Sequence, residues 1–522
     1  MPCGKRVAWF LKKMGEAMDL VFKRSNSIGL CRVATMESNA RACSLLLLLL
    51  LVLFGSGKGD DTSPFWEQTL PSTLFTSVGV IGSSSLMLQE ELAVRFAAAT
   101  WNRDPMLAEV FYPSSINATA AWTYRPDSSI TPSSLAVATA RHIDMKSTGP
   151  VDLVVANYFE DQQGHGRSAC NIVGFKSGDS AAKPIWQYNV TGSCSVDLSL
   201  EGDSKAALKM SDDGSTVVFA VSVLDDASGT AVPQLHCIDG QTGKLQFVYQ
   251  PKNEKPGSNS VSLSRGGDHI AYSNGLTIYV VEKSTGQLRT KPLVRQMYSD
   301  VHICPMGMFL LYAINLGSVV RRWNAATEQY EVTPFQPKTP AGEPNSWIAV
   351  SHSTSVNGED HNPAGCIAAV GWLGMGPNQG VAKLEVFSML TGQVFVEWTS
   401  TKGAGYQNFP VMAMHLGYTA LATWGNDNLA DEPNIMLFHT DFGNTTVMEY
   451  TAKGSVMAID MVYTPYALPP VQADDQIGHN RSTLADVYLV AAAKLEHASV
   501  PGIGGQCLAF KIPVAARPRP RL

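Results

Sequence analysis

The sequence is poor in charge and lacks the local signatures of common enzymes. Only 16% of its 522 residues are charged, whereas 45% are hydrophobic, which excludes a largely disordered chain. It contains no Gly-x-Ser-x-Gly, His-Glu-x-x-His, phosphate-binding loop, EF-hand loop or Trp-Asp dipeptide, so no common catalytic or nucleotide-binding motif assigns a reaction. Cys-x-x-Cys pairs are also missing, which leaves no zinc-binding spacing.

Acidic residues outnumber basic residues in the chain beyond residue 57. Residues 58–522 hold 31 Lys and Arg against 42 Asp and Glu, a net charge of −11. Nucleic acid is therefore not an expected partner, because its phosphates require a basic surface.

The longest apolar run is too short to span a bilayer. It extends from Leu45 to Phe54, whereas a membrane-spanning helix needs about 20 residues. Small residues follow at 55–57, so region 1–57 is predicted to contain a secretory signal peptide. A start at Met36 would give an ordinary length before the apolar core, and we expect it to be the initiator. We therefore expect a secreted or lumenal chain, with an uncleaved membrane anchor as the alternative.

Acceptor sequons and cysteines are both typical of an exported chain. Asn-x-Ser/Thr sequons predict a glycoprotein, and they lie at Asn117, Asn189, Asn444 and Asn480. Beyond residue 57 there are six cysteines, which permit three disulfides in an oxidising compartment but equally suit free buried thiols.

Two kinds of turn alternate from about residue 134 onward. Ser211-Asp-Asp-Gly214 and Cys304-Pro-Met-Gly307 each precede an apolar strand, and a Thr-Gly turn follows one strand later at 242–243, 285–286 and 391–392. Glycine permits the tight turns that join antiparallel strands. The pattern indicates a four-stranded unit that recurs about every 40 to 65 residues, which is typical of propeller blades with loop insertions.

One segment resembles a known repeat. Asp239-x-x-Thr242-Gly243-Lys244-x-x-Phe247 is similar to the repeat of the quinoprotein-like (PQQ-repeat, WD40-like) propeller superfamily, which carries Trp at the last position. Residues 211–214 resemble the Ser-Pro-Asp-Gly turn of other bacterial-type propellers. The likeness is at superfamily level over about residues 135–513 and implies fold rather than function. Quinoprotein enzymes typically have eight blades and often adjacent cysteines beside the cofactor. Because this chain lacks adjacent cysteines and shows fewer units, neither PQQ nor calcium is predicted.

The predicted architecture is all-β: a single β-propeller of about seven four-stranded blades over residues 120–513. The last unit lacks a fourth strand, so we expect an N-terminal strand at Ala120–Arg125 to pair with Cys507–Lys511 and close the ring. Residues 58–119 are then a lead-in, with a short helix over Leu86–Thr100. Residues 514–522 form a Pro/Arg-rich tail.

The loops between second and third strands open on the face where propeller ligands bind. They are long in five consecutive units and rich in acidic and aromatic residues, which predicts a ligand-binding crescent. Its members are Glu160, Asp161, His165, Asp225, Asp226, Trp372, Trp424, Asp427, Asp431, Glu432, Glu496 and His497. The alternative is that these residues are solvated loop tips. No metal site is predicted, although Glu160, Asp161 and His165 form a cluster with metal-like chemistry.

The sequence thus predicts a non-enzymatic module that binds a protein or glycan at the loop-rich face. An enzyme remains the alternative, either a quinone-dependent oxidoreductase or a hydrolase with carboxylates in the central funnel. A scaffold that uses the blade edges is the third hypothesis.

Overall fold

The structure is a computed structural model, and all of its strands belong to one unit spanning residues 62–522. Within the described residues, the regular secondary structure consists of 33 β-strands. The structure describes residues 63–71, 74–82, 94–101, 108–111, 120–126, 132–140, 151–160, 168–191, 194–195, 207–225, 229–252, 254, 260–294, 298–314, 317–337, 347–353, 366–373, 382–400, 411–415, 417–423, 433–439, 445–465, 484–496 and 504–515.

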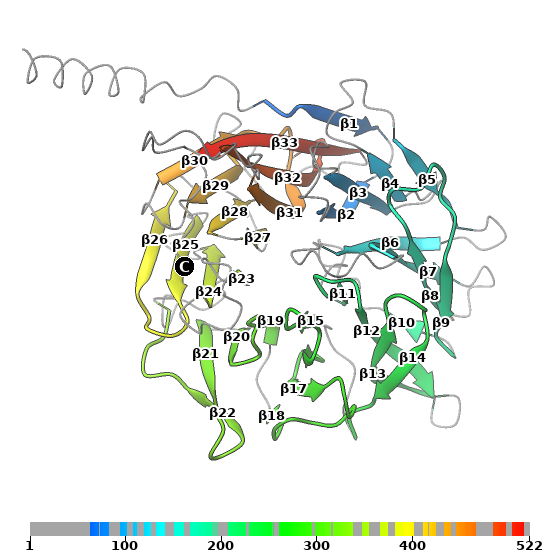
Figure 1. The fold of residues 1–522 in the computed structure, drawn as a ribbon, viewed down its shortest axis with the longest axis vertical. Helices are drawn as coiled ribbons and strands as arrows, with labels where there is room; N and C mark the ends of the chain where they lie inside the picture. Colours follow the sequence, from blue (N-terminus) through cyan, green and yellow to red (C-terminus); the bar gives the residue numbers. More distant parts are fainter. Residues whose placement is uncertain are drawn as a thin grey trace, which may run out of the picture. The chain divides into compact units, whose positions relative to one another are not determined.

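The first four sheets, named blades 1 to 4, follow one another along the chain (Figure 1). Blade 1 contains β2 (Leu74–Ile81), β3 (Arg95–Trp101), β4 (Ala108–Phe111) and β5 (Trp122–Tyr124). Blade 2 contains β6 (Pro132–Thr139), β7 (Leu153–Glu160), β8 (Ser168–Phe175) and β9 (Trp186–Asn189). Blade 3 contains β10 (Cys194–Ser195), β11 (Leu208–Met210), β12 (Thr216–Asp225), β13 (Thr230–Asp239) and β14 (Leu245–Tyr249). Blade 4 contains β15 (Ser260–Leu263), β16 (His269–Ser273), β17 (Thr277–Glu282) and β18 (Leu293–Val294).

Blades 5 to 8 continue the same order. Blade 5 contains β19 (Tyr298–Ile303), β20 (Phe309–Ile314), β21 (Gly317–Asn324) and β22 (Gln329–Val332). Blade 6 contains β23 (Trp347–Ser353), β24 (Ile367–Leu373), β25 (Ala382–Ser388) and β26 (Val394–Thr399). Blade 7 contains β27 (Val411–His415), β28 (Tyr418–Ala422), β29 (Ile435–His439) and β30 (Thr445–Tyr450). Blade 8 combines β31 (Val456–Pro465), β32 (Leu484–Lys494) and β33 (Gly505–Ala515) with β1 (Trp66–Leu70).

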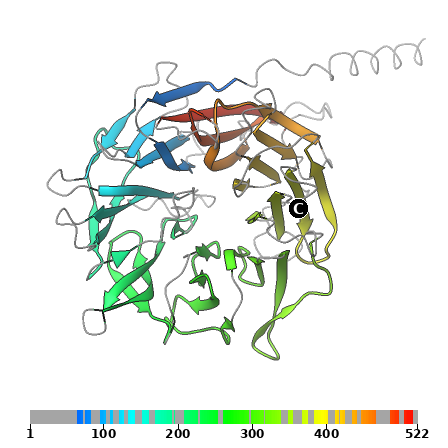
Figure 2. The same ribbon diagram turned by 180° about the vertical axis from the view of Figure 1, so that it is seen from behind.

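The eight sheets form a ring, which confirms the β-propeller architecture. Each innermost strand contacts the next around the circle, from β2 through β6, β11, β15, β19, β23, β27 and β31 back to β2. Figures 1 and 2 show these strands around a common centre, with the fourth strands at the rim. All strand pairs within the sheets are antiparallel, for example β6 with β7 and β31 with β32.

The number of blades differs from the prediction of about seven. The difference lies in residues 58–119, which were expected to be a lead-in but contain β1 to β4. The helix expected over Leu86–Thr100 is wrong in its described part, because Arg95–Trp101 is the second strand of blade 1. Ala97, Ala98 and Ala99 are all buried there, so packing between sheets overrides the helical preference of alanine.

The strand pairing at the C-terminal blade also differs from the prediction. Residues 120–125 were expected to pair with Cys507–Lys511, but Trp122–Tyr124 forms β5 and pairs with β4. The open edge of β33 is taken instead by β1, with Trp66 opposite Ala509 and Gln68 opposite Cys507. An unpaired edge would leave a row of backbone donors and acceptors exposed, so this pairing protects the last blade.

The hydrophobic core lies between adjacent blades rather than inside any one of them. One cluster joins Ala136 and Ile172 of blade 2 to Val217 and Phe219 of blade 3, and another joins Leu437 of blade 7 to blade 8. Both faces of the middle strands are therefore covered, which explains their continuous apolar runs. No helix in the described residues is long and apolar enough to cross a membrane.

Three Thr-Gly turns connect blades 3, 4 and 6 to the blades that precede them. Aromatic side chains at or just after outer strands lie against the turn glycines of the next blade: Trp186 on Gly243, Phe247 on Gly286 and Phe335 on Gly392. Gly243 has a φ of 70°, a conformation that favours glycine. The indole N–H of Trp186 donates to the carbonyl of Gly240 at 2.9 Å. The motif that resembles the PQQ repeat therefore acts as an inter-blade contact.

Candidate functional site: the central channel

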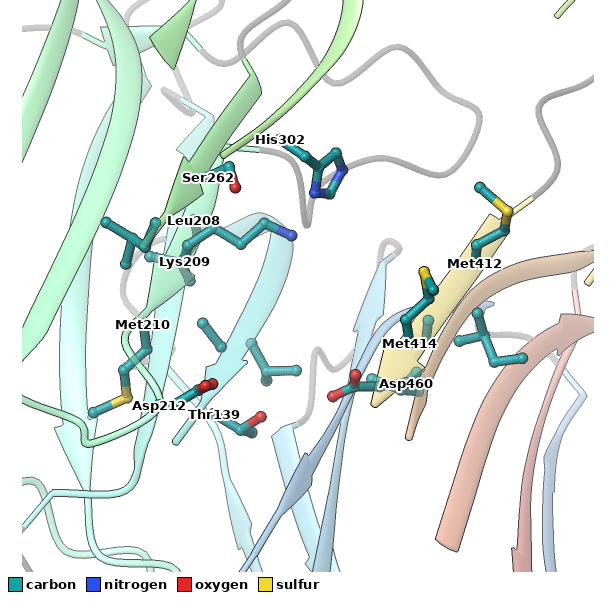
Figure 3. Close-up of a pocket in the computed structure, with 16 residues that line it drawn as sticks. Thr139, Leu208, Lys209, Met210, Asp212, Ser262, His302, Met412, Met414 and Asp460 are labelled. Atoms are coloured by element: carbon teal, nitrogen blue, oxygen red, sulfur yellow. The ribbon is translucent and has the colours of Figure 1, made fainter. Parts of the chain in front are cut away.

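The innermost strands surround a cavity of about 180 Å³ at the centre of the ring. It is lined from strands β2, β6, β11, β15, β19, β27 and β31, so seven of the eight blades contribute. Figure 3 shows the labelled side chains that lie around it: Thr139, Leu208, Lys209, Met210, Asp212, Ser262, His302, Met412, Met414 and Asp460. None of the described lining residues is Trp, Tyr or Phe.

A positively charged group lies on one side of the cavity. Lys209 on β11 is half-buried, and its ammonium group points into the cavity in Figure 3. Its flanking residues Leu208 and Met210 are buried, so the lysine interrupts an apolar strand. Within the described residues, the ammonium group of Lys209 makes no direct hydrogen bond or salt bridge, although its charge acts on nearby Asp300. A lysine held in this way retains free donors for an incoming anion.

His302 lies near Lys209 and is fixed by an acidic neighbour. Its Nε2 atom is 3.2 Å from the Asp300 carboxylate, which also accepts hydrogen bonds from Ser260 Oγ and the Val301 N–H, both at 2.9 Å. Burial would raise the pKa of Asp300, but His302 and Lys209 together with the Ser260 hydrogen bond hold it below its usual value. Asp300 is therefore an anion that orients His302.

The opposite side of the cavity is apolar with one carboxylate. Met412 and Met414 on β27 line this side of the cavity and pack against the apolar cluster between blades 6 and 7, and Asp460 lies on β31. Oδ2 of Asp460 accepts the N–H of Val80 at 2.9 Å, which links blade 8 to blade 1. Flexible methionine side chains adapt to varied ligand shapes, so this wall suits a peptide side chain better than a rigid planar group.

The predicted crescent is mostly outside the described residues or differently placed. Trp372 was expected on an exposed loop but is 5% exposed, packed between blades 5 and 6 with Phe387. Glu496 is exposed just after β32, whereas Glu160 and Asp225 end strands β7 and β12. The second-unit loop expected to be long joins Asp225 to Thr230 with four residues between them. Asp161, His165, Asp226, Trp424, Asp427, Asp431, Glu432 and His497 lie outside the described residues.

Export-related features are described only in part. Asn189 is exposed in β9, where its Oδ1 accepts the amide of Gln187 at 2.9 Å, while Asn117, Asn444 and Asn480 lie outside the described residues, as does region 1–57. Cys170 is disulfide-bonded. Four buried cysteines are outside any disulfide: Cys237, Cys304, Cys366 and Cys507.

No metal-binding group of three or more His, Cys, Asp or Glu side chains occurs in the described part of the chain. The sequence suggested fewer blades than quinoprotein enzymes typically have, but the structure has eight. The expectation of no quinone and no calcium stays a prediction.

Neither Lys209 nor His302 was among the site residues predicted from the sequence. A signal for Lys209 was present, because a single lysine inside Ala-Leu-Lys-Met stands directly before a Ser-x-x-Gly turn. That position places it on an innermost strand. The proximity of Lys209 to His302 could not be read from the sequence, since they belong to blades 3 and 5.

Comparisons with known proteins do not assign the chain to a family. No family model and no curated protein matches the chain. A chain of the solved structure "Crystal Structure of Mitotic Checkpoint Complex" is similar with a TM-score of 0.37 and 12% identity, covering 62% of this chain and 83% of that chain. BamB from Moraxella catarrhalis is similar with a TM-score of 0.38 and 11% identity, covering 84% of this chain and all of that chain.

Proposed function

We propose that this chain is a non-enzymatic interaction module of the secretory pathway, and that a protein partner inserts an acidic side chain into its central channel beside Lys209. The observation that carries the proposal is the half-buried ammonium group without an ion-pair partner among the described residues. A carboxylate placed there would form a charge-assisted hydrogen bond in a partly dehydrated site. Such a contact supports a specific interaction.

The cavity favours a protein side chain over a glycan. Its volume of about 180 Å³ is below the range of about 300–1,000 Å³ that is usual for whole small-molecule sites. Sugar rings commonly stack on aromatic side chains, and the described lining offers none. A single inserted side chain fits both features.

Export is supported by three separate features. Leu45–Phe54 is the apolar core of a signal peptide, Cys170 is disulfide-bonded, and the sequon residue Asn189 is exposed on β9. N-terminal sequencing of protein made in eukaryotic cells tests this part. A mature chain in the medium that starts near residue 58 is expected, and retention in the membrane fraction would instead favour an uncleaved anchor.

Selection from a displayed peptide library tests the binding site. Peptides enriched on the secreted protein should contain Asp or Glu, and Lys209→Met should weaken their binding at least tenfold, because loss of one member of a buried charged pair costs about 2–5 kcal/mol. Lys244→Met is the matched control, since Lys244 is exposed in the turn before β14 at the rim.

Two results would contradict the proposal. Peptides whose affinity is the same for the Lys209→Met and Lys244→Met variants would exclude the channel as the recognition site. Binding on a glycan array with no enrichment of acidic peptides would replace the protein partner by a carbohydrate.

A further inference from the structure

Two free cysteines from neighbouring blades lie in contact within the core. Cys304 begins the turn between β19 and β20 of blade 5, and Cys366 immediately precedes β24 of blade 6. Their exposed fractions are 0% and 2%, and both belong to the apolar cluster that contains Trp372. The two thiols share a hydrogen bond. They are therefore already paired across the blade boundary.

The turn itself does not require a cysteine. In blades 3 and 4 the same position is held by serine, and Oγ of Ser211 and Ser264 accepts the backbone N–H five residues later at 3.0 and 2.9 Å. Cys304 Sγ accepts the N–H of Phe309 in the same way at 3.2 Å. A hydroxyl makes this turn equally well, so the sulfur at position 304 has a use beyond the turn.

The second cysteine also occupies a position that repeats between blades. The carbonyl of Cys366 accepts the N–H of Met389 at 2.9 Å. Ser215 in blade 3 and Asp268 in blade 4 accept the equivalent hydrogen bond, also at 2.9 Å. Repeated backbone hydrogen bonds thus anchor both cysteines, and the contact between their sulfurs follows from the packing of blade 5 on blade 6.

The surroundings shift the pKa values of the two thiols in opposite directions. Burial alone would raise the pKa of Cys304, but hydrogen bonds from the Cys366 thiol and from backbone N–H groups of Phe309, Met308 and Met306 hold it below its usual value. The same hydrogen bond, together with burial, raises the pKa of Cys366. Cys304 is therefore the more acidic thiol of the pair, and Cys366 donates the hydrogen bond between them.

We propose that Cys304 and Cys366 are a redox site that closes into a disulfide between blades 5 and 6 when a disulfide oxidant of the glutathione class is present. While the two blades are apart, the thiolate of one cysteine attacks one sulfur of oxidised glutathione, forms a mixed disulfide and releases one glutathione thiolate. That thiolate takes the proton of the other cysteine, whose sulfur then attacks the first cysteine and releases the second glutathione. Two protein thiols are oxidised by two electrons, and one glutathione disulfide is reduced to two thiols.

Burial determines when this exchange takes place. Because both sulfurs are closed off from solvent in the assembled ring, the oxidant reaches them before blades 5 and 6 pack or during their separation. Oxidation is therefore fast while the chain folds and slow in the folded protein. Once formed, the bond connects two blades covalently and restrains the unfolded chain. This inference does not depend on the channel or its ligand.

Peptide mapping of the full chain tests the site. The protein is refolded in oxidised and reduced glutathione, alkylated under denaturing conditions and digested with trypsin without reduction. The expected product is peptide 296–321 linked to peptide 339–383, since each contains one cysteine. Oxidised protein should also have a Tm a few degrees above that of reduced protein, and Cys304→Ser should abolish this difference while keeping the turn.

Cys237→Ser is the matched control. Cys237 is a buried free thiol of blade 3, so its replacement should leave the linked peptide and the Tm difference intact. Recovery of Cys304 and Cys366 as separate alkylated peptides after refolding with oxidised glutathione would overturn the proposal. Linkage of either cysteine to a different one would do the same. The linked peptide and the Tm difference are both measured on the wild-type chain, so the outcome does not depend on whether either variant folds.

Discussion

Replacement of Gly243 by alanine tests the contact that joins consecutive blades. Its φ of 70° costs about 1–2 kcal/mol for a residue with a Cβ atom. The new Cβ would lie 2.7 Å from Cγ and Cδ2 of Trp186, well inside the usual carbon–carbon separation. Trp186 cannot withdraw without losing its hydrogen bond to Gly240, so overpacking adds about 1–3 kcal/mol. We expect Gly243→Ala to destabilise the protein by about 2–5 kcal/mol.

Gly229→Ala separates the two contributions. Gly229 has a φ of 64°, but a Cβ added there meets no atom within 4 Å, so only the backbone cost of about 1–2 kcal/mol applies. Urea denaturation followed by circular dichroism measures both variants. If Gly243→Ala is no more destabilising than Gly229→Ala, the aromatic contact does not hold the blades together and the reasoning is refuted.

Three further predictions concern single side chains. Trp186→Phe removes the donor to the buried carbonyl of Gly240 and should lower the free energy of unfolding by about 1–3 kcal/mol in the same denaturation assay. Burial lowers the pKa of His236 to about 4, so between pH 6.5 and 4 the unfolded chain binds a proton that the folded chain does not. The free energy of unfolding should therefore fall by up to about 3 kcal/mol as the pH is lowered from 6.5 towards 4. His236→Gln should flatten this pH dependence, and an unchanged slope would exclude His236 as its source. Arg289→Lys loses the guanidinium that lies 4.0 Å over the Trp323 ring of the next blade and should cost about 1–2 kcal/mol, measured as a lower Tm.

The local repeat was readable because a turn depends on a few consecutive residues. The turns at 211–214 and 304–307 correctly marked the starts of β12 and β20, and the Thr-Gly turns correctly marked the ends of the third strands of blades 3, 4 and 6. The place of β5 in the ring was nevertheless wrong, because a strand pattern does not specify its partner.

The first blade was missed for a different reason. The alanines of Arg95–Trp101 have helical propensity, but they are buried between β2, β4 and the next blade. Small side chains there permit close approach of the sheets, and this long-range packing overrides the local preference. The turn motifs of the other blades gave no signal in this part of the chain.

The candidate site shows the same division between local and long-range information. The lysine in the apolar segment before residue 211 and the cysteine in a serine turn position are both visible in the sequence. Their partners are not, because Lys209 approaches Asp300 and His302, and Cys304 meets Cys366, only when separate blades pack side by side.

The sequence by itself determined the all-β class, the turns and the alternation of strands within most blades, since these follow from contacts between residues close along the chain. The tertiary structure alone decided that there are eight blades, that β1 covers β33 and that seven innermost strands enclose a charged channel. The physical reason is that a ring must satisfy the edges of all its sheets at once, and that condition depends on residues hundreds of positions apart.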